Sequence, residues 1–288
     1  MVERFTDSYV TMFINSAYSR GNELEFLGLL FLFLGRILPI IALSPFFGAR
    51  VMPNPVKVAL ALSLFVIFVP YLLILTKKPI PFDTLMLVFF FKEVFIGLLI
   101  GFIMGIFFTV VQGAGMIIDH QRGGASLMVN DPTIQNQSSP LGTLFNMVLI
   151  VIFFLVDGPF LFLDAIVKSY EVLPIDEMLN PTFFDKTSPF WVLLVQLFNE
   201  IMVLTIQICS PALIAILMTD VFLGIANRLA PQVQITFLGM PLKSLLGLTV
   251  VCFGWTLMTS EFAKQSLLWV KHVLDVIQMM KPLSIPIP

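Results

Sequence analysis

Four charged residues lie inside strongly apolar stretches of this chain: Arg36, Lys92, Glu93 and Glu200. A charge at the centre of a membrane helix costs about 2.5–3.5 kcal/mol on insertion, so such residues usually couple to ions or pair with other helices. Lys92 and Glu93 are adjacent and diverge by about 100° on a helix, so we expect partners on other helices or other chains. For Lys92 the alternative is a position near an interface, where the side chain reaches water.

A second polar pattern lies in the same block as Glu200. Gln196, Glu200 and Gln207 fall within about 40° of one another on an ideal helix. Exposing these polar side chains of an otherwise apolar helix to lipid would be energetically unfavourable. We interpret it as a seam between helices or subunits, with a pore-lining surface as the alternative.

The residue types needed for catalysis or metal binding are not grouped in the sequence. His120 and His272 have no spacing partner, and Cys209 and Cys252 lie in apolar runs without a CxxC pattern. No nucleotide loop or nucleophile elbow occurs. We therefore predict no catalytic residue, no metal and no cofactor, and a net charge of −2 gives no basic surface for nucleic acid.

The elements that position these residues must be membrane helices, as the composition indicates. Hydrophobic residues make up 58% of the chain and charged residues only 12%, with a mean hydropathy of +0.98. Soluble domains are about 25% charged. The apolar blocks are long and uninterrupted, which favours helix over strand and predicts an all-α, polytopic membrane protein. The six blocks cover residues 26–47, 58–75, 85–118, 141–166, 190–218 and 245–258.

Two blocks do not fit simple upright spans. A helix over 85–118 would be about 50 Å long, against a hydrocarbon slab of about 30 Å, so it must break, tilt or continue beyond the slab. Gly97, Gly101 and Gly105 line one face of it, which favours close packing of another helix over a chance pattern. The turn at 157–159 should split the fourth block into two short helices. These features predict helical hairpins with broken helices.

Polar segments suggest the domain organisation. We expect a polar N-terminal segment over 1–25 that is not a cleaved signal, a helical domain over 26–260, and a C-terminal tail over 261–288 that could form an amphipathic helix. Within the helical domain, residues 119–140 should be irregular and residues 164–189 should form a solvated loop.

Three motifs resemble the FliR/SctT family, the export-gate subunits of bacterial flagellar and type III secretion systems. The most specific is NRLAPQ at 227–232 followed by GMPLK at 239–243. An earlier passage agrees, with Arg36, then PFFG at 45–48 and VMPNPVK at 51–57. IDHQRG at 118–123 is similar to the polar segment after the family's long helix. The likeness covers residues 26–260.

The resemblance implies a core subunit of the export gate in the bacterial inner membrane, and no enzymatic activity. With the R-type and S-type sister subunits it would form a gated pore for unfolded secreted polypeptides. The switch protein and the large export-gate protein of the same system, and membrane lipid, would be further partners. Whether the host machine is a flagellum or an injectisome stays open, with an injectisome, a virulence system, as our preference. The alternative function is a stand-alone, ion-coupled transporter of small molecules.

The resemblance also implies roles for individual residues. Residues 113–128 match the family's plug, with an ordinary connection as the alternative. The predicted plug residues are Gly113, Gly115, Asp119, Gln121, Gly123, Gly124 and Met128. The predicted subunit contacts or structural polar residues are Arg36, Lys57, Lys92, Glu93, Gln196, Glu200, Gln207, Asp220, Asn227, Arg228, Pro231, Pro241 and Lys243, of which Asp220, Arg228 and Lys243 should hold the turn between the last two hairpins.

Overall fold

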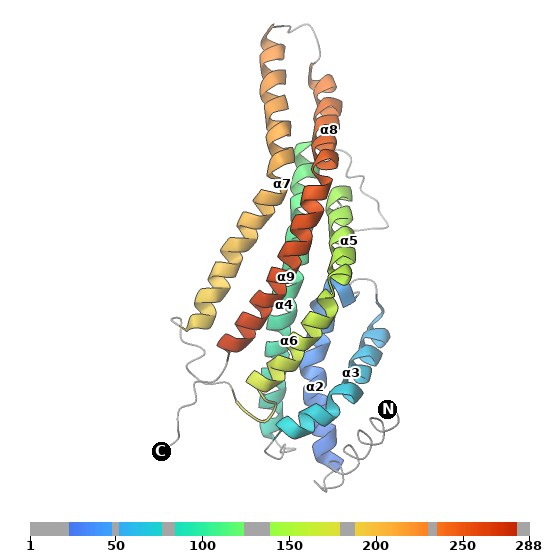
Figure 1. The fold of residues 1–288 in the computed structure, drawn as a ribbon, viewed down its shortest axis with the longest axis vertical. Coiled ribbons are helices and arrows are strands. Elements are labelled where there is room, and N and C mark those ends of the chain that lie inside the picture. The colour runs from blue at the N-terminus through green and yellow to red at the C-terminus, as the bar shows by residue number, and fades with distance from the viewer. Residues whose placement is uncertain are drawn as a thin grey trace. The chain divides into compact units, whose positions relative to one another are not determined.

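A computed structural model of the protein describes residues 23–47, 52–76, 84–123, 139–178, 188–229 and 235–280. In these ranges the chain forms eight α-helices and a short 3-10 helix, and no residue of them lies in a strand. The predicted all-α class is therefore confirmed (Figure 1). The helices are α2 (Glu23–Leu43), α3 (Asn54–Leu75), α4 (Thr84–Gln121), α5 (Pro140–Leu155), α6 (Gly158–Val172), α7 (Pro189–Leu229), α8 (Ile235–Phe253) and α9 (Trp255–Met279), with η1 (Pro45–Phe47).

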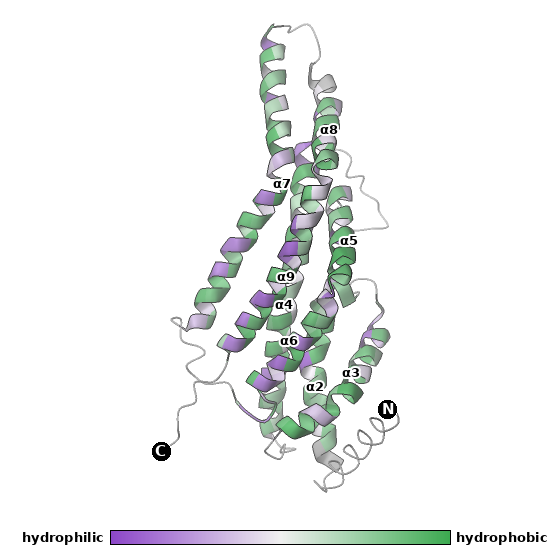
Figure 2. Ribbon diagram, viewed as in Figure 1, coloured by the Kyte–Doolittle hydropathy of each residue, from purple (hydrophilic) through white to green (hydrophobic). Residues whose placement is uncertain are grey.

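Most of these helices are long and apolar enough to cross a membrane. Helices α2, α3, α4 and α7 each qualify alone within the described ranges. The pairs α5–α6 and α8–α9 qualify as two further spans if each bent pair is counted as one. Apolar residues dominate α2, α3 and α5, whereas polar residues recur along α7 and α9 (Figure 2). Four to six candidate spans agree with the predicted polytopic architecture.

Helix α4 is continuous over 38 residues, so the long third block does not break. Its three spaced glycines allow the α2 backbone to come close. A Cβ atom at Gly97 would overlap the Arg36 carbonyl group, one at Gly101 would lie 3.0 Å from the Ile40 Cα, and one at Gly105 would lie 2.7 Å from the Leu43 oxygen. The predicted close packing of another helix along this face is confirmed.

The described chain divides into two compact units. Unit 1 holds α2, η1, α3, α6 and the part of α4 through Gly105, with the first residues of α7 and the last residues of α9. Unit 2 holds the rest of α4, α5, α8 and most of α7 and α9. In unit 1, Phe33 stacks on Tyr170 with ring centroids 5.8 Å apart. In unit 2, Phe107 stacks on Trp269 at 5.5 Å. The predicted domain over 26–260 and the tail over 261–288 stay predictions, and α9 runs across their boundary.

Two sharp bends lie where the chain carries glycine. The first follows α5 at Asp157, whose φ of 57° is left-handed, and α6 begins at Gly158. A side chain at Gly158 would overlap the ring of Phe153. The second separates α8 from α9 by 60° at Gly254. The predicted split of the fourth block is thus confirmed.

The expected solvated loop over 164–189 needs a partial correction. Its first residues lie in α6, which continues to Val172, and Ser169, Tyr170, Leu173 and Ile175 are buried. Asp220 and Arg228 lie in α7, which continues to Leu229, and Lys243 lies in α8. Spaced polar residues suit one face of an amphipathic helix as well as they suit a loop.

Candidate functional site

The first polar cluster lies in unit 1 and centres on Arg36 of α2. Its guanidinium forms a bidentate ion pair with the carboxylate of Glu93 on α4, with Nε 2.5 Å from Oε2 and Nη2 2.9 Å from Oε1. Both side chains are fully buried. Nη2 also donates to the Leu173 carbonyl at 2.8 Å, and Nη1 donates to the Ser169 hydroxyl at 3.1 Å. A bidentate pair with further hydrogen bonds is the geometry in which a buried ion pair offsets its desolvation.

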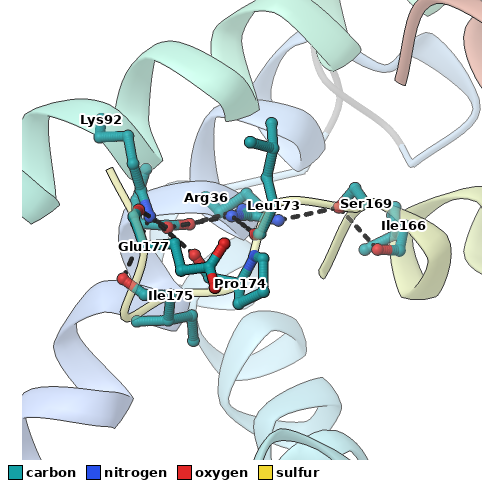
Figure 3. A network of polar contacts seen from close by, with 9 residues as sticks. Arg36, Lys92, Ile166, Ser169, Leu173, Pro174, Ile175 and Glu177 are labelled. Atoms are coloured by element: carbon teal, nitrogen blue, oxygen red, sulfur yellow. Dashed lines mark hydrogen bonds and ion pairs between the residues drawn. The ribbon is translucent and has the colours of Figure 1, made fainter. Parts of the chain in front are cut away.

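Lys92 completes this cluster with a set of backbone acceptors (Figure 3). Its ammonium donates to the carbonyl oxygens of Pro174, Ile175 and Glu177 at 2.9, 3.1 and 2.8 Å. It also lies 2.9 Å from Oε1 of Glu93. Lys92 and Glu93 thus each have partners on other elements, and they also contact each other although they diverge by about 100° on the helix. The flexible lysine stem spans the angle between the two positions.

The polar contacts of this cluster connect helices α2 and α4 to the chain that follows α6. Residues 173–177 follow the end of α6 and are not helical, so their carbonyl groups have no helical partner, and a buried backbone carbonyl needs a hydrogen-bond partner. Arg36 and Lys92 supply donors for the chain that leaves α6, at residues 173–177, from two other helices. The guanidinium also lies 4.0 Å above the Tyr170 ring. Lys92 is 6% exposed, so protein covers its side chain in the described residues, while the position of this residue in the membrane stays a prediction.

The second cluster lies in unit 2 and centres on Asp119 near the end of α4. This carboxylate is 1% exposed. Its Oδ2 accepts the backbone N–H of Leu141 at 2.9 Å and the hydroxyl of Ser139. The Ser139 Oγ in turn accepts the N–H of Gly142 at 2.9 Å and so caps α5. A carboxylate beside the first turn of a helix is also favoured by the helix dipole.

Arg122 connects Asp119 to helix α8. Its Nε and Nη2 both lie 2.7 Å from Oδ1 of Asp119, and its Nη1 donates to the hydroxyl of Ser244 at 3.1 Å. The neighbouring residue on α8, Lys243, forms an ion pair with Asp220 on α7. Asp220 and Lys243, both predicted to hold this hairpin, are brought together in the structure.

The other predicted plug residues are spread over helix and turn. Gly113 and Gly115 lie inside α4, where a Cβ at Gly115 would come within 2.5 Å of the Gly142 nitrogen on α5. Gln121 is the last residue of α4, and Gly123 makes the following turn with a φ of 90°. Gly124 and Met128 lie outside the described residues. The plug role itself stays a prediction.

The remaining predicted contact residues are mostly at the surface. Gln196 and Gln207 are exposed on α7 and Glu200 is half-buried between them, so the predicted stripe is partly accessible. Asn227 and Arg228 are exposed near the end of α7. Lys57 is half-buried on α3, Pro241 is exposed within α8, and Pro231 lies outside the described residues.

Sequence reasoning missed several partners of these clusters. Ser139 was detectable, since a serine followed by proline is typical of a helix N-cap and first helical position. No sequence pattern around Ser169 or Ser244 identifies them as hydrogen-bond partners of the charged residues. The carbonyl groups of residues 173–177 cannot be identified from sequence either, because every residue carries a carbonyl group. Among the described residues, no group of three or more His, Cys, Asp or Glu side chains could hold a metal ion.

Comparison with known proteins gives one consistent result. Residues 27–267 match a family described as bacterial export proteins, family 1. The chain is 34% identical over 193 residues to Yop proteins translocation protein T of Yersinia pestis, covering 66% of this chain and 70% of that protein. It is 34% identical over 165 residues to secretion system apparatus protein SsaT of Salmonella typhimurium, covering 57% and 61%. It is 28% identical over 222 residues to flagellar biosynthetic protein FliR of Bacillus subtilis, covering 76% and 83%.

Proposed function

Because this chain belongs to the FliR/SctT family of type III secretion export proteins, we propose that it is a core subunit of the export gate. It is a multi-pass membrane protein, and we place it in the bacterial inner membrane. With R-type and S-type sister subunits it forms a gated pore through which unfolded polypeptides leave the cytoplasm. Higher identity to the Yersinia and Salmonella proteins than to the flagellar one supports an injectisome-type system.

The observation that carries this proposal is the exposed apolar surface of α7. This helix has 41 residues and is about 60 Å long. A slab of about 30 Å covers roughly 40 Å of a helix tilted by about 40°, the upper end of the usual range. Apolar side chains are exposed along the whole helix, from Val192 at 50% through Met218 at 67% to Leu229 at 81%. The excess apolar length needs a protein cover, which sister subunits provide.

The polar residues fit the same assignment. The exposed amides of Gln196 and Gln207 would be unfavourable against lipid, so they support a subunit seam or an aqueous surface. By contrast, Arg36, Lys92 and Glu93 are bound to one another, and the two cations are also bound to backbone carbonyls, so these charges already have partners within the chain. This arrangement disfavours the alternative of a stand-alone, ion-coupled transporter.

The experiment is co-purification of the full chain from cells that express its gene neighbourhood. We expect two small apolar proteins to remain bound to the tagged chain in mild detergent. The variant Met218→Trp adds bulk that lipid tolerates and a packed interface does not, so it should lower the yield of the complex with unchanged expression. Met279→Trp, at an exposed position on α9, is the matched control. A wild-type chain that purifies alone from these cells would contradict the proposal.

A further inference from the structure

Polar side chains link four helices of unit 2 in sequence. Asp119 on α4 contacts the start of α5, Arg122 carries the connection to α8, and α8 is paired with α7. We propose that this chain of contacts is a mechanical coupling in which Arg122 is the positioning residue. We name it the polar belt: Ser139, Asp119, Arg122, Ser244, Lys243 and Asp220.

The geometry of Arg122 gives the belt its stiffness. A guanidinium is planar, so its donors cannot turn independently of one another. Two nitrogens are bound to Oδ1 of Asp119 while the third is bound to Ser244. A shift of Ser244 that keeps this hydrogen bond must therefore rotate the whole group and loosen the Asp119 contacts. The Arg122 and Asp119 side chains are only 12% and 2% exposed, so little water is present to replace a lost contact.

At the α7 end of the polar belt, α8 packs closely against α7. Lys243, next to Ser244, pairs with Asp220 on α7. A Cβ atom at Gly247 would lie 3.0 Å from the Ile216 side chain, and one at Gly239 would lie 3.0 Å from Leu223. These contacts join residues 216–223 of α7 to residues 239–247 of α8. A displacement of α7 therefore carries Ser244 with it.

At the near end, Asp119 holds both ends of the connection between α4 and α5. It fixes Arg122, one residue before the turn at Gly123, and it fixes Ser139 and Leu141 at the start of α5. Movement of the α7–α8 hairpin would thus change how far apart these two ends lie. This consequence rests on the proposed function, in which α7 contacts sister subunits.

Hydrogen exchange of the Leu141 amide tests the coupling, because that N–H is bound to Asp119. The full chain is purified in detergent, and exchange is measured with residue resolution. Ser244→Ala removes the α8 acceptor without touching the Asp119–Arg122 pair. It should speed exchange at Leu141 by about tenfold, as expected for one hydrogen bond of typical net strength. Lys243→Met should act in the same direction.

Two further variants separate coupling from general stability. Arg122→Lys keeps the charge and loses the planar fork, so it should speed Leu141 exchange while the thermal midpoint stays unchanged. Ser260→Ala removes a serine whose hydroxyl bonds only its own helix, at the Leu257 carbonyl, and should change nothing. Unchanged Leu141 exchange in both Ser244→Ala and Arg122→Lys would overturn the coupling. The measurement needs no export and no sister subunit, so its failure is distinct from failure of the proposed function.

Discussion

Replacing Arg36 with methionine should destabilise unit 1 severely. The change leaves the buried carboxylate of Glu93 with Lys92 as its remaining charged partner. It also removes the donors bound to the Leu173 carbonyl and the Ser169 hydroxyl. Removing one partner of a buried ion pair costs about 3–5 kcal/mol. Since domains are stable by only about 5–15 kcal/mol, this loss is a large share of the total.

The double variant Arg36→Met with Glu93→Leu tests the energetic coupling between the two buried residues. It removes the Arg36–Glu93 pair and fills the site with apolar side chains, while Lys92 keeps its three carbonyl acceptors. Glu93→Leu alone leaves two buried cations, Arg36 and Lys92, without their carboxylate, whereas the double variant leaves only one. We therefore expect the double variant to be more stable than Glu93→Leu alone by about 2 kcal/mol or more, because the two sites are strongly coupled.

The assay is equilibrium unfolding of the purified chain in mixed micelles with increasing SDS, followed by circular dichroism. Arg228→Met is the matched control, because Arg228 is exposed near the end of α7. It should shift the unfolding free energy by less than about 0.5 kcal/mol. The reasoning is refuted if Arg36→Met behaves like Arg228→Met, or if the double variant is no more stable than Glu93→Leu.

Two further predictions concern backbone positions. Gly97→Ala should reduce the thermal midpoint of the purified chain, because the added methyl group would overlap the Arg36 carbonyl. Gly113→Ala, on the same helix, adds a methyl group in open space and should match or exceed the thermal midpoint of the wild type. Equal midpoints for the two variants would contradict the close helix packing. Asp157 has a φ of 57°, a left-handed conformation that glycine adopts at little cost and valine does not. Asp157→Gly should therefore raise the free energy of unfolding by up to about 1 kcal/mol, and Asp157→Val should lower it, in the same SDS titration. A more stable valine variant would exclude a left-handed backbone at this position.

The sequence predicted the helices and their special glycines well, because apolar length and glycine spacing are local properties. The length of α4, its glycine face for close helix packing and the break at Asp157 all follow from patterns within one segment, whereas the identity of the packed helix, α2, does not. The end of α7 was missed because its last turns carry Asp220, Asn227 and Arg228, which are as typical of a loop as of a helix surface.

The polar clusters were predicted in part. Charges in apolar blocks pointed to Arg36, Lys92 and Glu93, and the pattern required them to have partners. Their pairing could not be predicted, because Arg36 and Glu93 are 57 positions apart and the fold alone brings them together. The acceptors of Lys92 are backbone carbonyls, which no side-chain pattern records.

The cluster around Arg36 has a consequence for how the protein is made. Arg36 leaves the ribosome 57 residues before Glu93, and Lys92 precedes its first carbonyl acceptor by 82 residues. At about 5–20 residues per second, Arg36 waits roughly 3–11 s for its carboxylate. During that interval a bare guanidinium on α2 opposes entry into lipid. Membrane insertion of α2 must therefore lag behind its synthesis, or proceed while the translocation machinery shields the charge, until α4 arrives to neutralise it.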